Sequence, residues 1–402
     1  MIDQRLLTHK EELVNYWMKI NMNKKRIEPL VHTKQELKEY FYEIMNKGEY
    51  LYIDKDIAFS YAFFELNERI KNELKIIFEK MNYVFTYIYD DSQIDTLLFH
   101  SENKNCFFRH NNKNLNSETF TFEGVAKLDT EYLAKGEIFS VMDVVDKFAN
   151  DVLNIPLVYG KDLYKEEYRW YAMLPNNEML KVGEISYDFS SSHIIKFSLD
   201  FSLFIASILM NSDEKGIVLP TRVSPIDIVV LPKNKAKVGT LDLCKKICNE
   251  LKDYKVLLDD SEDNFGYKNA YYDFKGIPFK VIASISEGEE KIVLVTRYNH
   301  EKIELGLEEL KKYIYIKSIR ISKEILKLNR KRVDEKTELI REGNLDKNKI
   351  NIVPWCGEEC INIDTDYDYL IPFHQMLSSV PCHFCGKLNK KFIYIIKKTK
   401  IF

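Results

Sequence analysis

One short segment near the middle of the chain, residues 216–227, constrains the fold more than any other. It reads Gly-Ile-Val-Leu-Pro-Thr-Arg-Val-Ser-Pro-Ile-Asp, so two prolines bracket a single arginine, Arg222, between two apolar runs. Proline fixes its own φ and favours an extended conformation in the residue before it. We therefore expect a rigid, extended connector that leads into a buried strand at 226–231. The patterns of expected helices and strands differ before and after this connector.

Size and composition bound what the chain can be. Its 402 residues exceed one ordinary core, so two or three domains are expected. An apolar fraction of 45% and a charged fraction of 30% are typical of a soluble globular protein. A net charge of −3 argues against a generally basic nucleic-acid binder but leaves room for a local basic face. No run approaches a membrane helix and no signal peptide is recognisable, so we expect a cytoplasmic protein without membrane contact.

The periodicity of apolar residues predicts different organisation on the two sides of the connector. Before it, we expect helices, strands and one Asn-rich loop or hairpin tip at 103–116. Helices are expected at 1–48, 58–82 and 138–153. Strands are expected at 83–89 and, as a strand-turn-strand, at 168–186. The apolar segment 197–210 should be buried, either as a helix or as a strand. After it, strands alternate with helices, which indicates an α/β domain. There the strands are 226–231, 256–259, 277–283 and 292–295, and the helices are 241–252 and 307–341.

Four of the seven cysteines cluster near the C-terminus in two short knuckles. Cys356 and Cys360 form a C-x3-C pair, and Cys382 and Cys385 form a C-x2-C pair. Two such knuckles can place four thiolates tetrahedrally around one Zn²⁺, and a site closed by four thiolates is structural. The alternative is a set of reduced, unliganded cysteines. Cys244 and Cys248 lie four apart on an expected helix, where buried apolar packing is the simpler interpretation.

Several motifs after the connector occur in the order found in one known family. They are the connector itself, Leu258-Asp259-Asp260, Gly266-Tyr267-Lys268, Lys275-Gly276-Ile277-Pro278, Val293 to Arg297, and Pro354-Trp355-Cys356 with the other three cysteines. Together they resemble the anticodon-binding and zinc domains of prolyl-tRNA synthetases of the archaeal and eukaryotic type. The resemblance implies that Arg222 contacts an anticodon base, a role that suits a guanidinium. It also implies that Lys268 and Arg297 support the anticodon backbone, the alternative being solvated surface charges.

The first half resembles the class II catalytic domain of that family in outline but lacks its arginines. The chemistry of amino-acid activation builds negative charge on phosphoryl oxygens, which arginines and Mg²⁺ stabilise. Asn105 and Leu203 stand where the motif 2 and motif 3 arginines are expected, and Phe107 replaces the motif 2 glutamate. Between Arg69 and Arg222 the chain contains only Arg109 and Arg169. Lysine does not replace a bidentate arginine, so we expect no catalytic residues and no ATP or Mg²⁺ site.

The expected fold class is α+β, in four parts. Residues 1–215 form a class II synthetase-like antiparallel-sheet domain, 216–316 an α/β anticodon-binding-like domain, 317–345 a helical linker and 346–402 a small zinc-binding domain. The resemblance also implies a homodimer through the motif 1 helix, residues 59–81, although its apolar face could equally be core.

Two hypotheses about function come from different classes. The first is a non-catalytic relative of the synthetases that binds tRNA, with tRNA-Pro as the expected partner, in a regulatory, accessory or scaffolding role. The second is an enzyme, either with altered chemistry in a remodelled pocket, including prolyl-tRNA-dependent amide formation, or as a divergent proline–tRNA ligase. A related variant of the second is a heteromer with an active synthetase.

Overall fold

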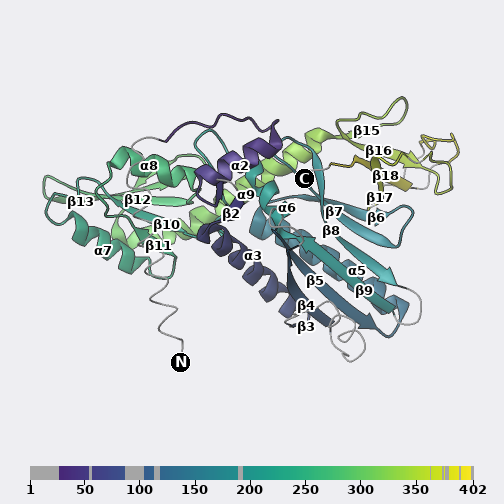
Figure 1. The fold of residues 1–402 in the computed structure, drawn as a ribbon, viewed down its shortest axis with the longest axis horizontal. Helices are drawn as coiled ribbons and strands as arrows, with labels where there is room; N and C mark the ends of the chain where they lie inside the picture. Colours follow the sequence, from purple (N-terminus) through teal and green to yellow (C-terminus); the bar gives the residue numbers. More distant parts are fainter. Residues whose placement is uncertain are drawn as a thin grey trace.

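The computed structural model describes residues 27–53, 57–86, 104–112, 118–188, 193–362, 364–373, 375, 380–388 and 391–399. These residues form a large-sheet domain and a small-sheet domain, which lie side by side and are bridged by one long helix (Figure 1). No helix in the described part is long and apolar enough to cross a membrane. The expected helix at 1–48 lies partly outside the described residues.

The large-sheet domain is built on an eleven-stranded sheet, most of whose neighbouring strands are antiparallel. From the N-terminal half come β3 (Tyr83–Phe85), β4 (Lys104–Asn112), β5 (Glu118–Leu128), β6 (Leu157–Asp162), β7 (Glu167–Met173), β8 (Met179–Asp188) and β9 (His193–Asp200). A two-stranded hairpin, β1 (Leu51–Ile53) and β2 (Ile57–Phe59), stands apart. This confirms the antiparallel sheet predicted for the first half of the chain.

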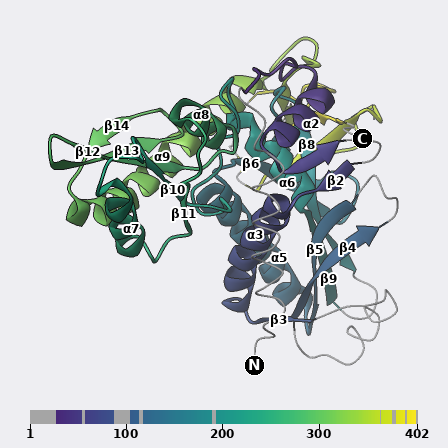
Figure 2. The ribbon, with the colours of Figure 1, turned by 60° about the vertical axis from the view of Figure 1, so that its left-hand side comes forward.

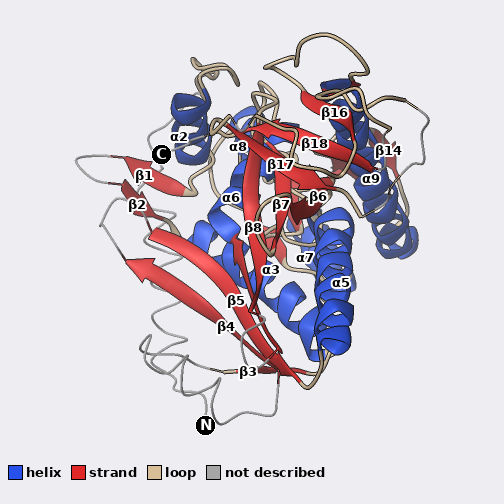
Figure 3. Ribbon diagram, turned by 90° about the vertical axis from the view of Figure 1, so that its right-hand side faces the viewer, coloured by secondary structure: helices blue, strands red, loops and turns tan. Residues whose placement is uncertain are grey.

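Helices cover one face of this sheet and close its core. They are α2 (Leu37–Lys47), α3 (Tyr61–Glu79), α5 (Glu131–Phe148) with a π-helix at Ala149–Leu153, and α6 (Phe201–Ile208) with a short 3-10 turn at Leu209–Asn211. Figure 3 shows α5 alongside the sheet, to the right of β5 and β8. The apolar stripe of α3, spaced three and four residues apart, packs here because this spacing lies on one helix face. Its buried members are Phe63, Leu66, Ile70, Leu74 and Phe78.

The small-sheet domain has five strands. The buried strand β10 (Ile228–Pro232) runs parallel to β11 (Val256–Leu258) and β12 (Phe279–Ser286), and β13 (Glu289–Thr296) and β14 (Lys302–Glu304) add antiparallel strands. Its helices are α7 (Thr240–Glu250) and α8 (Phe265–Phe274). The apolar run of β10 is buried along its whole length, as a central strand covered on both faces requires. The α/β pattern predicted after the connector is therefore confirmed.

Helix α9 (Leu307–Lys336) spans both domains. Its first turns bury Leu310, Ile314 and Ile321 in the small-sheet core, and its last turns bury Val333 against the large sheet. The Glu309 carboxylate accepts a hydrogen bond from the Gly306 backbone N–H, 3.0 Å away, which caps the start of the helix. The charged stretch after 311 therefore belongs to a packed bridge between the two domains.

The C-terminal strands extend the large sheet rather than forming a separate layer. They are β15 (Thr337–Leu339), β16 (Ile350–Trp355), β17 (Tyr367–Ile371) and β18 (Lys391–Lys397), and β17 pairs with β6. A small apolar cluster around Val353, Trp355 and Ile393 lies beneath the cysteines. The cysteine-bearing segment thus has its own packing but shares its backbone hydrogen bonds with the first half of the chain.

Two local predictions were wrong. The Asn-rich segment expected as a loop or hairpin tip at 103–116 contains the whole of strand β4, because pairing with β5 and burial of Cys106 and Phe107 outweigh its polar composition. No helix was expected between the strands at 256–259 and 277–283, but this segment contains α8, whose start is capped by the Asn264 side chain accepting from the Tyr267 N–H at 2.8 Å.

Three ion pairs join α3 to the small-sheet domain, and the ribbon in Figure 2 shows α3 on the side of the large-sheet domain that faces it. Glu65, Arg69 and Glu73 lie four residues apart on one side of α3 and pair with Lys255, Asp227 and Arg222. The Arg69 pair is bidentate, with nitrogen–oxygen distances of 2.8 and 3.3 Å. Because the charges alternate along α3, the pairs favour one register between the domains.

A buried arginine joins the C-terminal strands to the rest of the sheet. One terminal nitrogen of Arg169, on β7, lies 2.7 Å from carboxylate oxygens of both Asp162 and Asp368, and the other lies 2.8 Å from Glu167. The Tyr171 hydroxyl donates to the second Asp368 oxygen at 2.6 Å. Arg169 is 7% exposed, so this cluster links β6, β7 and β17 away from solvent.

We predict that Arg169→Ala lowers the free energy of unfolding by about 3–5 kcal/mol, because it leaves buried carboxylates without a compensating charge. Lys181→Ala is the matched control, since Lys181 pairs with Glu184 where both side chains are more than 40% exposed. That change should cost less than about 1 kcal/mol. Urea denaturation followed by circular dichroism compares the two, and equal midpoints would show that the buried cluster does not stabilise the sheet.

Candidate nucleic-acid interface and metal centre

Arg222 lies at the surface in a turn of the connector. The Val223 N–H donates to the Pro220 carbonyl at 3.2 Å, and this turn directs the Arg222 side chain outward, where it is 50% exposed. Its guanidinium lies 2.5 Å from the Glu73 carboxylate on α3. An exposed ion pair of this kind contributes little to stability, so the guanidinium can exchange Glu73 for another anion at small cost.

Lys268 has a structural position on α8. Its ammonium donates to the backbone carbonyls of Asp259 and Ser261, at 3.2 and 2.7 Å, and lies 3.1 Å from the Asp259 carboxylate. The residue is 4% exposed. Its contacts therefore hold the loop between β11 and α8 in place, which ties the Leu-Asp-Asp and Gly-Tyr-Lys motifs to each other.

Arg297 is buried even more completely, at 1% exposed. Its Nε donates to the Asp273 carbonyl at 2.8 Å, and its terminal nitrogens contact the two Asp213 carboxylate oxygens at 3.1 and 2.6 Å and the Gly216 carbonyl at 2.9 Å. The guanidinium thus joins α8 and β13 to the start of the connector.

These positions correct one expectation from the sequence. Neither Lys268 nor Arg297 is a solvated charge, and their burial does not fit a direct contact with an anticodon backbone. Lysine and arginine at these positions are used because each can satisfy several buried oxygen acceptors at once. Of the three cations predicted for tRNA, Arg222 alone combines exposure with a guanidinium that an RNA could reach.

The four C-terminal cysteines converge on one point. The Cys356–Cys360, Cys360–Cys382 and Cys356–Cys385 sulfur pairs are 3.5, 3.7 and 3.6 Å apart, and all four sulfurs lie within 4.8 Å of one another. Four sulfurs at ~2.3 Å from a central ion would be separated by just under 4 Å in a tetrahedron. The knuckles turn through Gly357 and Gly386, whose φ values are 89° and 69°. The cluster could therefore hold a metal ion.

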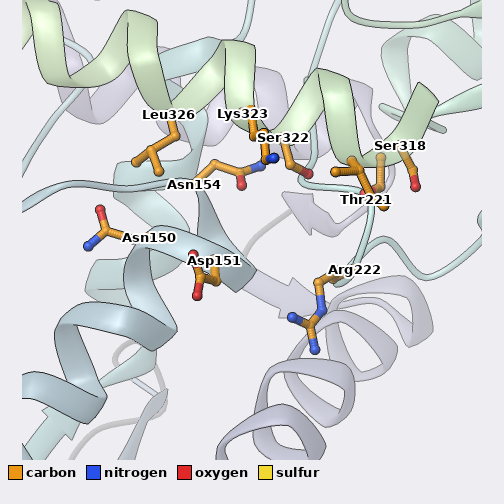
Figure 4. A pocket seen from close by; sticks show the side chains of 10 residues that line it. Asn150, Asp151, Asn154, Thr221, Arg222, Ser318, Ser322, Lys323 and Leu326 are labelled. Carbon is orange, nitrogen blue, oxygen red and sulfur yellow. The ribbon is translucent and has the colours of Figure 1, made fainter. Parts of the chain in front are cut away.

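A pocket of about 230 Å³, lined by both polar and apolar side chains, opens beside Arg222 (Figure 4). Three segments far apart in the chain form its walls: the π-helix after α5, the connector and α9. The polar lining residues are Asn150, Asp151, Asn154, Thr221, Arg222, Ser318, Ser322 and Lys323. Sequence patterns did not indicate this pocket, because no two of its walls are neighbours in the sequence.

The positions where the sequence resemblance predicts catalytic arginines and a glutamate carry Asn105, Leu203 and Phe107. Asn105 and Phe107 are buried on β4, and Leu203 is partly buried on α6. Arg109 pairs with Glu123 across β4 and β5 at 3.3 Å, and its guanidinium lies 5.9 Å from the Phe107 ring centre. Arg169 is held in the buried cluster with Asp162 and Asp368.

Comparisons with known proteins agree with this arrangement. A family model described as an anticodon binding domain matches residues 227–316, which comprise the small-sheet domain. The proline–tRNA ligase of Clostridium botulinum (strain Loch Maree / Type A3) is 27% identical over 310 residues. The chain is a relative of the prolyl-tRNA synthetases. The alignment covers 68% of this chain but only 65% of the C. botulinum relative, so it spans just under two thirds of that protein.

Two further relatives support the same placement. The proline–tRNA ligase of Alkaliphilus oremlandii is 26% identical over 322 residues, covering 70% of this chain and 67% of that protein. The crystal structure of the prolyl-tRNA synthetase from Cryptosporidium parvum, complexed with L-proline and AMP, superimposes with a TM-score of 0.78. The superposition covers 92% of this chain and 99% of the C. parvum chain at 17% sequence identity, which establishes a shared fold.

We predict that Arg297→Met lowers the free energy of unfolding by about 3 kcal/mol, because Asp213 and two carbonyls lose their shared donor. Burial opposes ionisation of Asp213, but the hydrogen bonds and charge of Arg297 outweigh it and hold the pKa of this carboxyl below its ordinary value. The pair therefore stabilises the fold fully above the ordinary carboxyl pKa of about 4. This contribution is lost as pH falls through the lowered pKa. Denaturation at several pH values should show the wild-type advantage shrinking in acid, and an advantage that does not depend on pH would contradict this role.

Proposed function

We propose that this protein binds tRNA without activating an amino acid, with tRNA-Pro as its partner, in a regulatory, accessory or scaffolding role. The observation that carries the proposal is the contrast between the two domains. The small-sheet domain matches an anticodon binding domain over its whole length. The large-sheet domain has Asn105, Phe107 and Leu203 at the positions where the chemistry needs arginine or glutamate.

The energetic argument rests on charge stabilisation. Removing one donor from a site of developing negative charge costs about 10²–10³ in rate, or ~3 kcal/mol. In this chain the arginines expected in motifs 2 and 3 are replaced. Two arginines remain between Arg69 and Arg222, and one of them, Arg169, is bound to three buried or half-buried carboxylates. Arg109 faces Glu123, which offsets its charge. The described sheet thus supports no strong binding of ATP or Mg²⁺.

In this proposal Arg222 contacts the anticodon, because it is the half-exposed guanidinium at the edge of the anticodon-binding-like domain. Lys268 and Arg297 would support the anticodon contact indirectly. They hold the loops on which the interface is built, which is the reason why they match the family's motifs while remaining buried.

The second part of the proposal is a structural zinc ion held by Cys356, Cys360, Cys382 and Cys385. The sulfur separations suit a tetrahedral ion, and closure by four thiolates leaves no open position for chemistry. Its role would be to hold the two knuckles together above the Val353–Trp355–Ile393 cluster. The buried Trp355 indole N–H donates to the Glu358 carbonyl at 2.9 Å, which fixes the first knuckle on that cluster.

We also propose that the protein forms a homodimer through α3, with a heteromer containing an active synthetase as the alternative assembly. Tyr61, Phe64 and Ile76 are 43%, 43% and 50% exposed on this helix, on residues not used by the core. Light scattering of the purified chain distinguishes a dimer from a monomer.

We expect tRNA-Pro to bind more tightly than bulk tRNA at ~150 mM salt, where contacts that do not read sequence are weakened. Arg222→Ala should remove most of this selectivity, because a bidentate contact to a base discriminates by ~1–3 kcal/mol. Glu73→Ala is the control variant, since it breaks the same ion pair while leaving the guanidinium in place. Fluorescence anisotropy with labelled transcripts measures all three proteins.

Two results would contradict this function. Equal affinity for all tRNAs, or none, would remove the anticodon-binding role. Amino-acid-dependent exchange between pyrophosphate and ATP would show surviving activation chemistry and favour the alternative of an enzyme with a remodelled pocket or a divergent proline–tRNA ligase.

We expect the purified protein to carry one zinc ion per chain and to melt at a lower temperature after chelation, because structural zinc contributes directly to folding. Cys382→Ser should lose the metal. Cys248→Ser, a half-buried cysteine of α7 far from the cluster in sequence, should retain it. Elemental analysis of the two variants measures this, and wild-type protein without zinc would disprove the site.

A further inference from the structure

The pocket beside Arg222 contains a buried hydrogen-bond donor whose role the fold does not explain. Asn154 ends the π-helix with φ 58° and ψ 32°, and its backbone N–H donates to the Ala149 carbonyl. Its own carbonyl accepts from the Asn329 side chain of α9 at 2.9 Å. The backbone of Asn154 is thus fully used in joining the two walls of the pocket.

The side-chain amide of Asn154 is different. The residue is 1% exposed, and its Nδ2 has no hydrogen-bond acceptor among the described residues. A buried donor without an acceptor costs about 1–3 kcal/mol. In Figure 4 the amide lies under α9, on the side of Ser322 and Lys323. This donor is therefore available to an acceptor that enters the pocket.

The remaining lining adds cations and hydroxyl donors. Lys323 is exposed, and the described part of the chain provides no ion pair for its ammonium. Thr221 and Ser322 contribute hydroxyl groups, whereas the Ser318 hydroxyl donates to the Tyr315 carbonyl at 2.8 Å. Arg222 and Lys323 carry two positive charges against the single carboxylate of Asp151, while Glu73 pairs with Arg222 from α3. Such a lining favours a singly charged anion over a dianion, because Asp151 repels additional negative charge.

Helix α9 continues the same charge pattern outside the pocket. Arg320, Lys327 and Arg330 are exposed and flank Lys323 at intervals of three and four residues, which places them along one side of the helix. Ten residues of helix span ~15 Å, a length that accommodates several successive backbone phosphates of one RNA strand. A basic stripe on one helix of an otherwise acidic chain is the usual electrostatic feature of a nucleic-acid contact.

We propose that this pocket binds a phosphodiester group of an RNA backbone. Asn154 Nδ2, the Lys323 ammonium and the Ser322 hydroxyl of α9 would donate to its oxygens, and the cations of α9 would contact the flanking phosphates. The inference rests on the proposed tRNA-binding function and adds to it a contact that carries no sequence information. Because the walls come from both domains, the bound strand crosses between the anticodon-binding-like domain and the large sheet.

The test uses the full chain with labelled tRNA-Pro and labelled bulk tRNA, over about 50–200 mM KCl. Lys323→Gln removes an exposed charge, and we expect both RNAs to bind about tenfold more weakly, with the salt slope reduced by about one. Asn154→Asp keeps the shape and tolerance for positive φ but replaces the donor by a carboxylate, so it should weaken both RNAs at least as much. Lys312→Gln is the matched control, because Lys312 is an exposed lysine of α9 that lies outside the pocket, ~16 Å along the helix.

Each outcome separates this site from the proposed function. Selective binding of tRNA-Pro that is as insensitive to Lys323→Gln as to Lys312→Gln overturns the phosphate site and leaves the function standing. Equal binding of all tRNAs that Lys323→Gln weakens supports the site and removes the selective function. No RNA binding overturns both. Should Asn154→Asp not fold, Lys323→Gln decides alone, since an exposed lysine does not support the core.

Discussion

The buried guanidinium of Arg297 fixes the geometry on which the other sites depend. It joins the α8 carbonyl of Asp273 to Asp213 and Gly216, so the start of the connector is anchored to the small-sheet domain before the prolines begin. The connector then has no freedom to rotate, and Arg222 emerges at one defined place between α3 and α9. A guanidinium suits this position because its planar array of donors satisfies three separate acceptors without further groups.

The use of arginine explains how a synthetase-like fold can keep its shape with Asn105 and Leu203 at positions where arginines are expected. In a synthetase-like sheet, arginines at the surface of the active site are held for substrate phosphates. In this chain Arg169 instead satisfies the carboxylates of Asp162 and Asp368 and thereby joins the C-terminal strands to β6 and β7. Solvated arginines contribute little to the stability of a fold. Removing Arg169 or Arg297 would leave buried carboxylates unpaired.

The sequence predicted features whose determinants lie close together in the chain. The α3 stripe, the β10 run and the two cysteine knuckles are each set by spacing within about thirty residues, and each forms as expected. The burial of Lys268 and Arg297 was not predicted, because a motif match identifies a residue type but not its exposure. The pocket could not be predicted at all: Asn154, Thr221 and Lys323 meet only after α9 has packed across both domains.

The position of Asn154 shows why α9 matters beyond packing. Asn329 of α9 binds the Asn154 carbonyl, so the helix holds the π-helix end in place while leaving the side-chain amide facing the pocket. In a fold stabilised by only ~5–15 kcal/mol, one unpaired buried donor is a substantial cost. That cost disappears when an anion supplies the missing acceptor, and the bound anion then contacts both domains at once. Binding of an RNA strand and rigid docking of the two domains would therefore favour each other, since both require the same closed arrangement of the connector, the π-helix and α9.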